Sequence, residues 1–372
     1  MSESMRAQIE RADLLVTAGP GGVGKTSTAA ALGVAAARAG RRVVVLTVDP
    51  ARRLAEALGL EEGEGADLPH RVSLDGEGAE AGELWAVMLD AQATFDRLVR
   101  EQSRSERQAA AVLGNPVYRA VAGSFSGAQE YMAIERLHQL HTSGEWDLVI
   151  VDTPPSRHAI DLLEAPDRLT SFLGHPVYRT LTAGQRTLAR VTDAATSVFL
   201  WAIKRLAGPQ LVEDVLQFFR ALAHIEPGIR ARAEEMADLL RAESTSFVVI
   251  TSPRAEAIGE TAHLIEALHT RGFPFGGVIA NLLHPLPEPL DSLPADELAA
   301  LDALEAGPLA DHVEWHHQLT ALAESERHEL AELEVVAGGA DVVELPLLET
   351  DVHDVSGLTV LADLLLASAA QS

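Results

Sequence analysis

Gly19-Pro20-Gly21-Gly22-Val23-Gly24-Lys25-Thr26 matches the pattern GxxxxGK[ST], and this stretch decides how the rest of the chain is interpreted. Small residues in such a loop let backbone N–H groups approach phosphate oxygens at the start of a helix. The lysine then meets the terminal phosphates and the hydroxyl meets magnesium. The expected cofactors are therefore ATP and Mg²⁺. The expected nucleotide-binding residues are Gly19, Gly21, Gly22, Val23, Gly24, Lys25, Thr26 and Ser27.

A dinucleotide site is the rival interpretation of the same glycines, because they also satisfy GxGxxG. Asp49 follows the second predicted strand, where a ribose-binding acid would lie in an NAD-binding enzyme. Lys25 and Thr26 separate the two, since a dinucleotide site needs neither an ammonium nor a magnesium-binding hydroxyl. The chain contains only two lysines, Lys25 and Lys204, so chance placement of one inside the motif is rare.

Strand and helix patterns alternate around this loop and predict an α/β fold. We expect one P-loop NTPase domain over residues 1–372, with a mainly parallel sheet flanked by helices. Strands are expected at 14–16, 42–48, 84–89, 146–151, 247–251, 277–280 and 342–345, and helices at 25–39 and 358–367. Residues 61–83 and 284–294 are expected to be solvated loops. Amphipathic helices at approximately 91–141 and 165–242 predict an inserted α-helical subdomain.

Composition narrows the function classes. The formal net charge of −26 disfavours binding to nucleic acid or anionic lipid, and no run of apolar residues reaches the roughly 20 that span a bilayer. Residues 1–12 lack the apolar core of a signal peptide, so we expect a cytoplasmic protein without a transmembrane segment. Cysteine is absent, which excludes disulfides and thiolate metal sites.

Two aspartates follow predicted strands and should meet the phosphate loop at one sheet edge. Asp49 ends the second strand and Asp152 the fourth. One such carboxylate can help to hold hydrated magnesium while the other orients the attacking water. The alternative is that each aspartate only caps the helix or turn that follows it.

The motifs at 21–26, 47–51 and 152–158 together resemble the P-loop, switch I and switch II of the arsenical-pump ATPase family. This family includes the guided-entry ATPases for tail-anchored membrane proteins. The segments Val278-Ile-Ala-Asn281 and Leu345-Pro-Leu-Leu348 resemble its adenine-recognition segments. The resemblance covers essentially the whole chain. It is nearest to the paired anion-transporter-like ATPases of actinobacteria.

The resemblance implies a role for each matching residue. Asp49 would activate the water and Lys25 would take part in catalysis. Thr26 would contact magnesium directly, and Asp152 through water. Asn281 would recognise the adenine edge, for which a side-chain amide has both donors and an acceptor, and Pro346 would cover the ring. A strand-end asparagine with a purely structural role is the alternative for Asn281.

Two departures from the family pattern bear on assembly. The CxxC pair that staples zinc-bridged homodimers is absent, as are the cysteines of arsenite-responsive members. Pro20 stands where the family carries a lysine that reaches the partner subunit's nucleotide. Arg52, Arg53 or Arg157 could supply that charge, although surface ion pairs are the simpler role for them.

The sequence therefore predicts a magnesium-dependent ATPase acting as a nucleotide-driven dimeric switch for a protein, membrane-segment or transporter client. It would be a homodimer, or a heterodimer with a homologous ATPase that retains the cross-subunit lysine, and slow without that partner. The alternative is a non-hydrolysing ATP-binding regulatory subunit. His312 and His316 are interpreted as part of a solvated helix face rather than a metal site.

Overall fold

The computed structural model describes residues 5–48, 58, 67–74, 82–116, 118, 128–175, 178–179, 182, 214–215, 217–290, 294 and 308–368. Asp49, Arg52 and Arg53 lie outside these residues. Within them, no helix combines the length and apolar character needed to cross a bilayer.

An eight-stranded sheet forms the centre of the molecule, in the order β3-β4-β2-β5-β1-β6-β7-β8. The strands are β1 (Leu14–Ala18), β2 (Arg42–Thr47), β3 (His70–Val72), β4 (Glu83–Met88), β5 (Leu148–Asp152), β6 (Thr245–Thr251), β7 (Phe275–Leu283) and β8 (Val342–Pro346). All neighbours are parallel except β3 and β4. The predicted fold class, a mainly parallel sheet between helices, is confirmed.

The edge strand β3 corrects the expectation of a loop over residues 61–83. It spans three residues and pairs antiparallel with β4, with Arg71 opposite Trp85. A segment this short shows no alternation of apolar and polar residues from which a strand could be predicted. It is a strand because it pairs with the free edge of the neighbouring strand β4. In contrast, the described residues of the second predicted loop, 284–290 and 294, form no α-helix and no strand, as expected for a loop.

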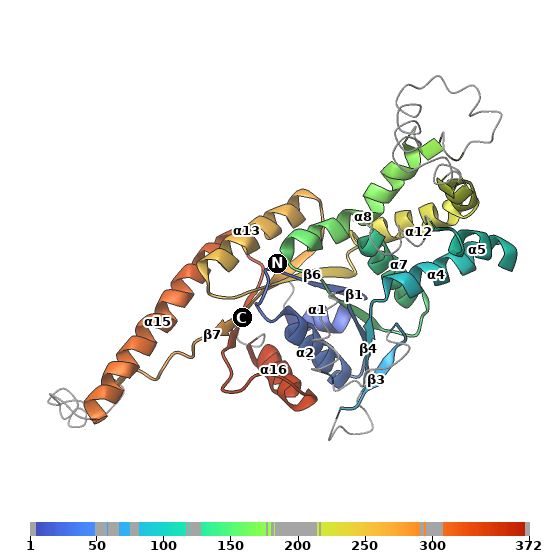
Figure 1. The fold of residues 1–372 in the computed structure, drawn as a ribbon. Coiled ribbons are helices and arrows are strands. Elements are labelled where there is room, and N and C mark those ends of the chain that lie inside the picture. Colours follow the sequence, from blue (N-terminus) through green and yellow to red (C-terminus); the bar gives the residue numbers. More distant parts are fainter. Residues whose placement is uncertain are drawn as a thin grey trace.

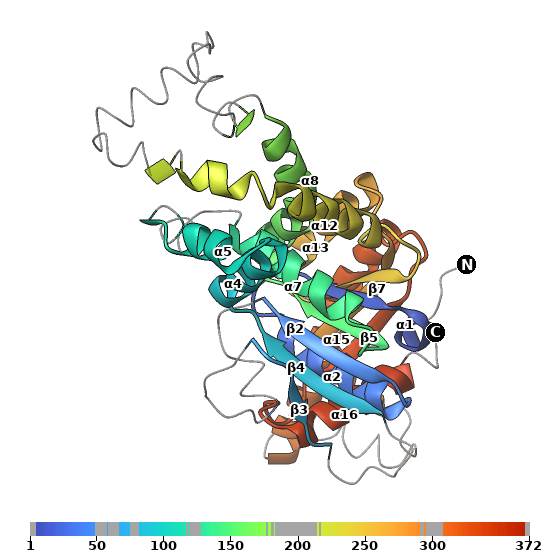
Figure 2. The same ribbon diagram turned by 90° about the vertical axis from the view of Figure 1, so that its right-hand side faces the viewer.

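Helices cover both faces of the sheet (Figures 1 and 2). One face is packed by α1 (Met5–Arg11), α2 (Lys25–Arg38) and α16 (Val355–Ser368). The other is packed by α7 (Ala128–Thr142), α8 (Ser156–Gly174), α12 (Glu226–Leu239), α13 (Ala255–Thr270) and α15 (Pro308–Val336). The sequence of strand β2 is a continuous apolar run because both faces of the strand are buried. Val43 and Val45 pack in the core on the first face, and Val44 and Leu46 in the core on the second.

A third group of buried residues lies among helices beyond the sheet. It joins α4 (Ala91–Gln102) and α5 (Glu106–Leu113) to the outer faces of α7, α8 and α12, through residues that include Leu98, Val112 and Tyr131. Asp90 and Ser105 cap α4 and α5 by accepting hydrogen bonds from backbone N–H groups. Most of these helices fall in the ranges 91–141 and 165–242, whereas α8 begins at Ser156, before the second range. An inserted helical subdomain stays a prediction.

Two helix glycines provide a matched test of this packing. A Cβ at Gly33 of α2 would lie 2.9 Å from both Leu84 Cδ1 and Val45 Cγ2, whereas one at Gly259 of α13 would meet nothing within 4 Å. Replacing a helix-interior glycine with alanine favours the helix by about 0.5–1 kcal/mol, and overpacking a core costs about 1–3 kcal/mol. We expect Gly259→Ala to raise the melting temperature and Gly33→Ala to leave it unchanged or lower it. Equal increases in both variants would contradict the close contact of α2 with the sheet.

Candidate functional site

The phosphate loop leaves β1 and enters α2 through two glycines, Gly19 and Gly24, at which a side chain would clash. A Cβ on Gly19, whose φ is 154°, would lie 2.0 Å from the carbonyl oxygen of Ile250 on β6. Gly24 precedes α2 with φ of 84°, and its Cβ would lie 2.4 Å from Asn281 Nδ2. The motif glycines thus let the backbone pass tightly beside β6 and β7, which brings the amides at the start of α2 to the sheet edge.

Lys25 is the first residue of α2 and lies over this loop. Its ammonium donates a hydrogen bond to the carbonyl oxygen of Pro20 at 2.7 Å, and the residue is 8% exposed. The ammonium is therefore held on the side of the loop where the backbone curls, which is the place a terminal phosphate requires. Pro20 contributes only its carbonyl to this contact and is itself buried.

The carboxylate of Asp152 accepts hydrogen bonds from two threonine hydroxyl groups. Thr26 Oγ1 donates to Asp152 Oδ2 at 2.8 Å, and Thr47 Oγ1 donates to the same oxygen at 3.0 Å. Asp152 is 0% exposed at the end of β5, between β1 and β2. A carboxylate and a threonine hydroxyl in contact form the oxygen donor set that magnesium prefers in phosphate sites. The sequence predicted Thr26 and Asp152 as magnesium-contacting residues and did not point to Thr47.

Asn281 of β7 contacts the phosphate loop itself. Its Nδ2 donates to the carbonyl oxygen of Val23 at 3.0 Å, and its Oδ1 accepts from the N–H of Leu282 at 2.9 Å. Leu282 is in the left-handed region with φ of 66°, which is costly for a residue with a branched side chain. The side chain of Asn281 thus braces the loop from the adjacent strand end. Its recognition of adenine stays a prediction.

Pro346 lies at the same edge of the sheet. It ends β8 opposite Leu283 of β7, and the next residue, Leu347, donates its N–H to the carbonyl oxygen of Leu283 at 2.7 Å. The two segments predicted to hold adenine are therefore neighbours, although they are more than 60 residues apart in the chain. Pro346 as a cover for the ring stays a prediction.

The segment after Asp152 connects the site to the helices. Thr153 Oγ1 donates to the carbonyl oxygen of Thr17 on β1 at 2.8 Å, and α8 begins three residues later at Ser156. Ser156 Oγ donates to Glu260 of α13 at 2.7 Å. Only three residues, Thr153, Pro154 and Pro155, therefore separate Asp152 from the start of α8.

Arg254 is a residue at this site that sequence analysis missed. Its Nη2 donates to the carbonyl oxygen of Gly22 at 3.3 Å, and its Nε donates to Ser252 Oγ at 3.2 Å. It follows β6 just before α13 and is exposed. In the sequence, Arg254 is marked only by its position after a predicted strand. That position indicates the phosphate loop only once β6 is known to lie beside β1.

The structure thus brings Lys25, Thr26, Asp152, Asn281 and Arg254 to one edge of the sheet. Asp49, Arg52 and Arg53 lie outside the described residues, and so does the side chain of Arg157. His316 Nε2 donates to the carbonyl oxygen of Glu288 at 2.8 Å. In the ranges that the structure describes, no group of three histidine, aspartate or glutamate residues is arranged to hold a metal ion.

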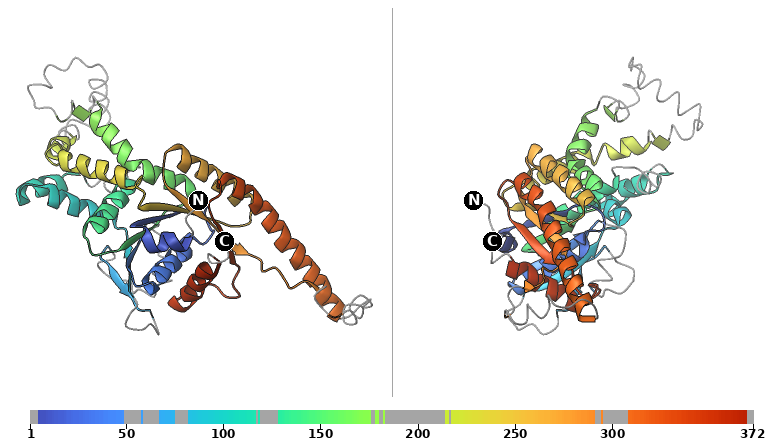
Figure 3. Two further views of the ribbon diagram at one scale, coloured as in Figure 1. Left: turned by 180° about the vertical axis from the view of Figure 1, so that it is seen from behind. Right: turned by 90° about the vertical axis from the view of Figure 1, so that its left-hand side faces the viewer.

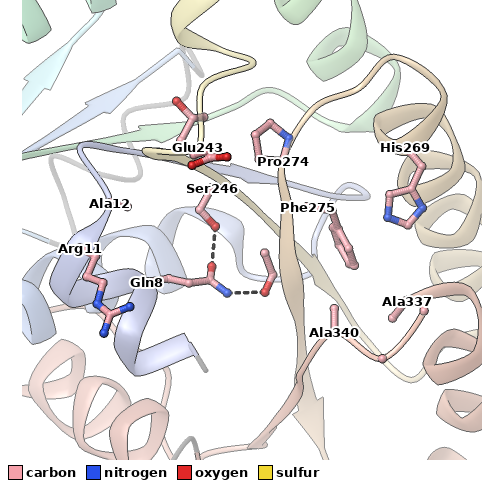
Figure 4. A pocket seen from close by; sticks show the side chains of 14 residues that line it. Gln8, Arg11, Ala12, Glu243, Ser246, His269, Pro274, Phe275, Ala337 and Ala340 are labelled. Atoms are coloured by element: carbon pink, nitrogen blue, oxygen red, sulfur yellow. Dashed lines mark hydrogen bonds between the residues drawn. The ribbon is translucent and has the colours of Figure 1, made fainter. Parts of the chain in front are cut away.

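A pocket of about 430 Å³ lies at the opposite edge of the sheet (Figure 4). Gln8 crosses it, donating to the carbonyl oxygen of Gly276 at 2.5 Å and accepting from Ser246 Oγ. Ligands of open parallel sheets bind outside the carboxyl ends of the strands, whereas this pocket is at the amino ends of β6 and β7. It is therefore separate from the phosphate loop.

The residues present fit Mg²⁺-ATP. Gly19 and Gly24 have no room for side chains, the ammonium of Lys25 faces the loop, and the Thr26 hydroxyl touches a carboxylate. These are the three groups that a P-loop needs for phosphates and magnesium. A dinucleotide site gives no reason for the contact between Thr26 and Asp152.

Comparisons with known proteins agree with this geometry. Residues 12–367 match the family model described as anion-transporting ATPase. The chain is 28% identical over 290 residues to the ATPase GET3B of Arabidopsis thaliana, covering 72% of this chain and 63% of that protein. It is 30% identical over 288 residues to the ATPase ARSA1 of Chlamydomonas reinhardtii, covering 71% and 34%. A putative arsenical pump-driving ATPase 2 of Aquifex aeolicus is 23% identical, with 72% and 79% covered. The chain spans less than two thirds of the length of the first two.

Asn281→Ala separates the two roles of this side chain. Losing one hydrogen bond to the phosphate loop should weaken binding of any nucleoside triphosphate, by up to about tenfold. If Asn281 also recognises adenine, ATP should lose more affinity than GTP, and this is the result we expect from titration calorimetry. Thr251→Val is the matched control, because Thr251 at the end of the neighbouring strand β6 forms its side-chain hydrogen bond with Thr261 of α13. Equal losses for ATP and GTP would restrict Asn281 to bracing the loop.

Proposed function

The chain belongs to the anion-transporting ATPase family, and we propose that it is a magnesium-dependent ATPase that hydrolyses ATP to ADP and phosphate. The family match confirms the resemblance predicted from the motifs. The contact of Thr26 with Asp152 beside the phosphate loop is the observation that carries the proposal. ATP is a cytoplasmic substrate, so we place the protein's action in the cytoplasm.

Each residue of the site has a distinct task in this reaction. The loop amides and the Lys25 ammonium bind the β and γ phosphates and stabilise the charge that develops on them. Thr26 would hold magnesium directly and Asp152 through water, and the metal would supply positive charge to the phosphates. Asp49 orients the attacking water and accepts its proton, a role proposed from the family motif alone.

Conformational switching is the purpose that we propose for this hydrolysis. Asp152 leads directly into α8, which packs on α7 and α12. Arg232 of α12 donates to the buried Glu135 of α7 and, at 3.0 Å, to Glu101 of α4. Burial raises the pKa of Glu135, and the charge of Arg232 opposes that rise. Because this ion pair clamps α7 to α12, the movement of α8 against them would change the surface of an inserted helical subdomain.

The proposed client belongs to one of three classes: a protein, a membrane segment or a transporter. The names of the relatives support a client-linked ATPase, because one is a putative arsenical pump-driving ATPase. The proposed assembly is a homodimer, or a heterodimer with a homologous ATPase that carries the cross-subunit lysine. Pro20 also supports the second candidate function, a regulatory subunit that binds ATP without hydrolysing it.

Turnover measurements distinguish the two functions. Lys25→Ala should abolish ATP binding, because the terminal phosphates lose their only lysine in the loop. Asp49→Asn should leave ATP binding intact and lower magnesium-dependent turnover by about 10²-fold or more, which is the contribution of a positioned general base. Phosphate release is the readout, with Asp13→Asn at the opposite end of β1 as the control. If the wild-type protein binds ATP tightly but shows no turnover, either alone or mixed with a homologous ATPase, the regulatory subunit is favoured.

The missing lysine provides a test of the assembly. A cation of this finger type is worth about 10³–10⁵ in phosphoryl transfer, so a wild-type homodimer should be slow. Arg254 is the described arginine bonded to the loop and could replace part of that charge. We expect Pro20→Lys to increase turnover and Arg254→Ala to decrease it, while Arg38→Ala at the far end of α2 has little effect. Fast turnover that neither variant changes would remove both residues from the charge balance.

A further inference from the structure

Helix α15 projects from the body of the protein as an arm (Figures 1 and 3). Its second half packs on α13 and β7, where Ala323, Leu330 and Leu333 are buried. Its first half extends past the sheet, accompanied by the chain that follows β7. The contact of His316 with the Glu288 carbonyl fixes that chain beside the helix.

An apolar stripe runs along the projecting half. Trp315, Leu319 and Leu322 are spaced four and three residues apart, which places them on one helix face. They are 67%, 41% and 42% exposed, and Leu286 on the accompanying chain is 50% exposed. Single exposed leucines are ordinary, but a tryptophan aligned with two leucines on a helix face is a typical contact surface.

The same stripe continues into the half that is covered. From Leu322, steps of four, four and three residues lead to Glu326, Leu330 and Leu333, all of which are buried. One continuous helix face is therefore buried against the body of the protein at one end and open at the other. This continuity indicates a face built to be covered along its whole length.

Charge identifies the chemistry of what covers it. Between residues 285 and 326 the sequence contains ten aspartates and glutamates and no lysine or arginine. This short stretch holds ten of the negative charges behind the net charge of −26. A second copy of the arm, a nucleic acid or an anionic membrane would be repelled, whereas a cationic surface would be attracted.

The base of the arm holds it in a fixed direction. Glu326 accepts from both the N–H and the Nδ1–H of His284, at 2.8 and 2.7 Å. The next residue, Arg327, pairs with Glu344 of β8 at 3.0 Å. A surface held in place before binding loses little conformational freedom when a partner arrives.

We propose that the arm surface formed by Leu286, Trp315, Leu319 and Leu322 docks a positively charged amphipathic helix of a partner protein. The apolar face of that helix covers the stripe. Its lysines and arginines meet the exposed carboxylates at the rim, Asp311 one turn before Trp315 and Glu288 on the accompanying chain. This binding needs no nucleotide and is independent of the proposed ATPase activity.

Binding of a synthetic peptide tests the proposal. The probe is a labelled helix of about 20 residues, long enough to fold on contact, with leucines on one face and lysines elsewhere. Its counterpart replaces every lysine with glutamate. Fluorescence anisotropy should detect binding of the lysine peptide alone, and Trp315→Ala should weaken it by about tenfold or more. Val360→Ser on α16, where Val360 is 48% exposed, should bind like the wild type.

The charge variants and the oligomeric state complete the test. Asp311→Asn with Glu288→Gln should weaken binding several-fold and flatten its dependence on salt, whereas Glu234→Gln on α12 should not. No binding of the lysine peptide, or binding that Trp315→Ala leaves unchanged, would overturn the proposal. It would also be overturned if Trp315→Ala dissociates an assembly of the protein alone in sedimentation velocity, since a second copy would then be the occupant.

Discussion

The buried Oδ2 of Asp152 is the point on which the site depends, because it accepts hydrogen bonds from Thr26 of α2 and Thr47 of β2. This carboxylate, at the end of β5, therefore ties together the start of α2 and the end of β2. A buried carboxylate is tolerated when hydroxyl donors compensate its lost hydration. Magnesium binding would rearrange these bonds, so the nucleotide state would be felt directly at the start of α8.

Sequence patterns predicted the fold and part of the site because they report local chemistry. The phosphate loop, the strands β1, β2 and β5, and the position of Asp152 at a strand end near the loop follow from motif spacing and apolar runs. The assignment of Asp152 to magnesium beside Thr26 came from the family resemblance. Thr47 and Arg254 were missed because their partners come from other strands, so strand order had to be known first. Strand β3 was missed because only its pairing with β4 makes it a strand.

Two features indicate that residues outside the phosphate-loop motif contribute to the site. Pro20 has no charged side chain and contacts Lys25 through its backbone carbonyl, while Arg254 approaches the loop from the end of β6. Asn281 braces the loop, and three residues later His284 is fixed to the base of the projecting arm through Glu326. The nucleotide site and the base of the arm thus share one strand end.

Nucleotide affinity with and without magnesium tests the central claim most directly. Calorimetric titration of the wild-type protein with ATP, in excess magnesium and then in excess chelator, should show affinity at least about tenfold higher with the metal. In Thr26→Val and Asp152→Asn that difference should vanish while residual ATP binding persists, because the loop and Lys25 remain. Tight binding of NAD with none of ATP, or a magnesium effect that survives both variants, would contradict a P-loop ATPase site at Thr26 and Asp152.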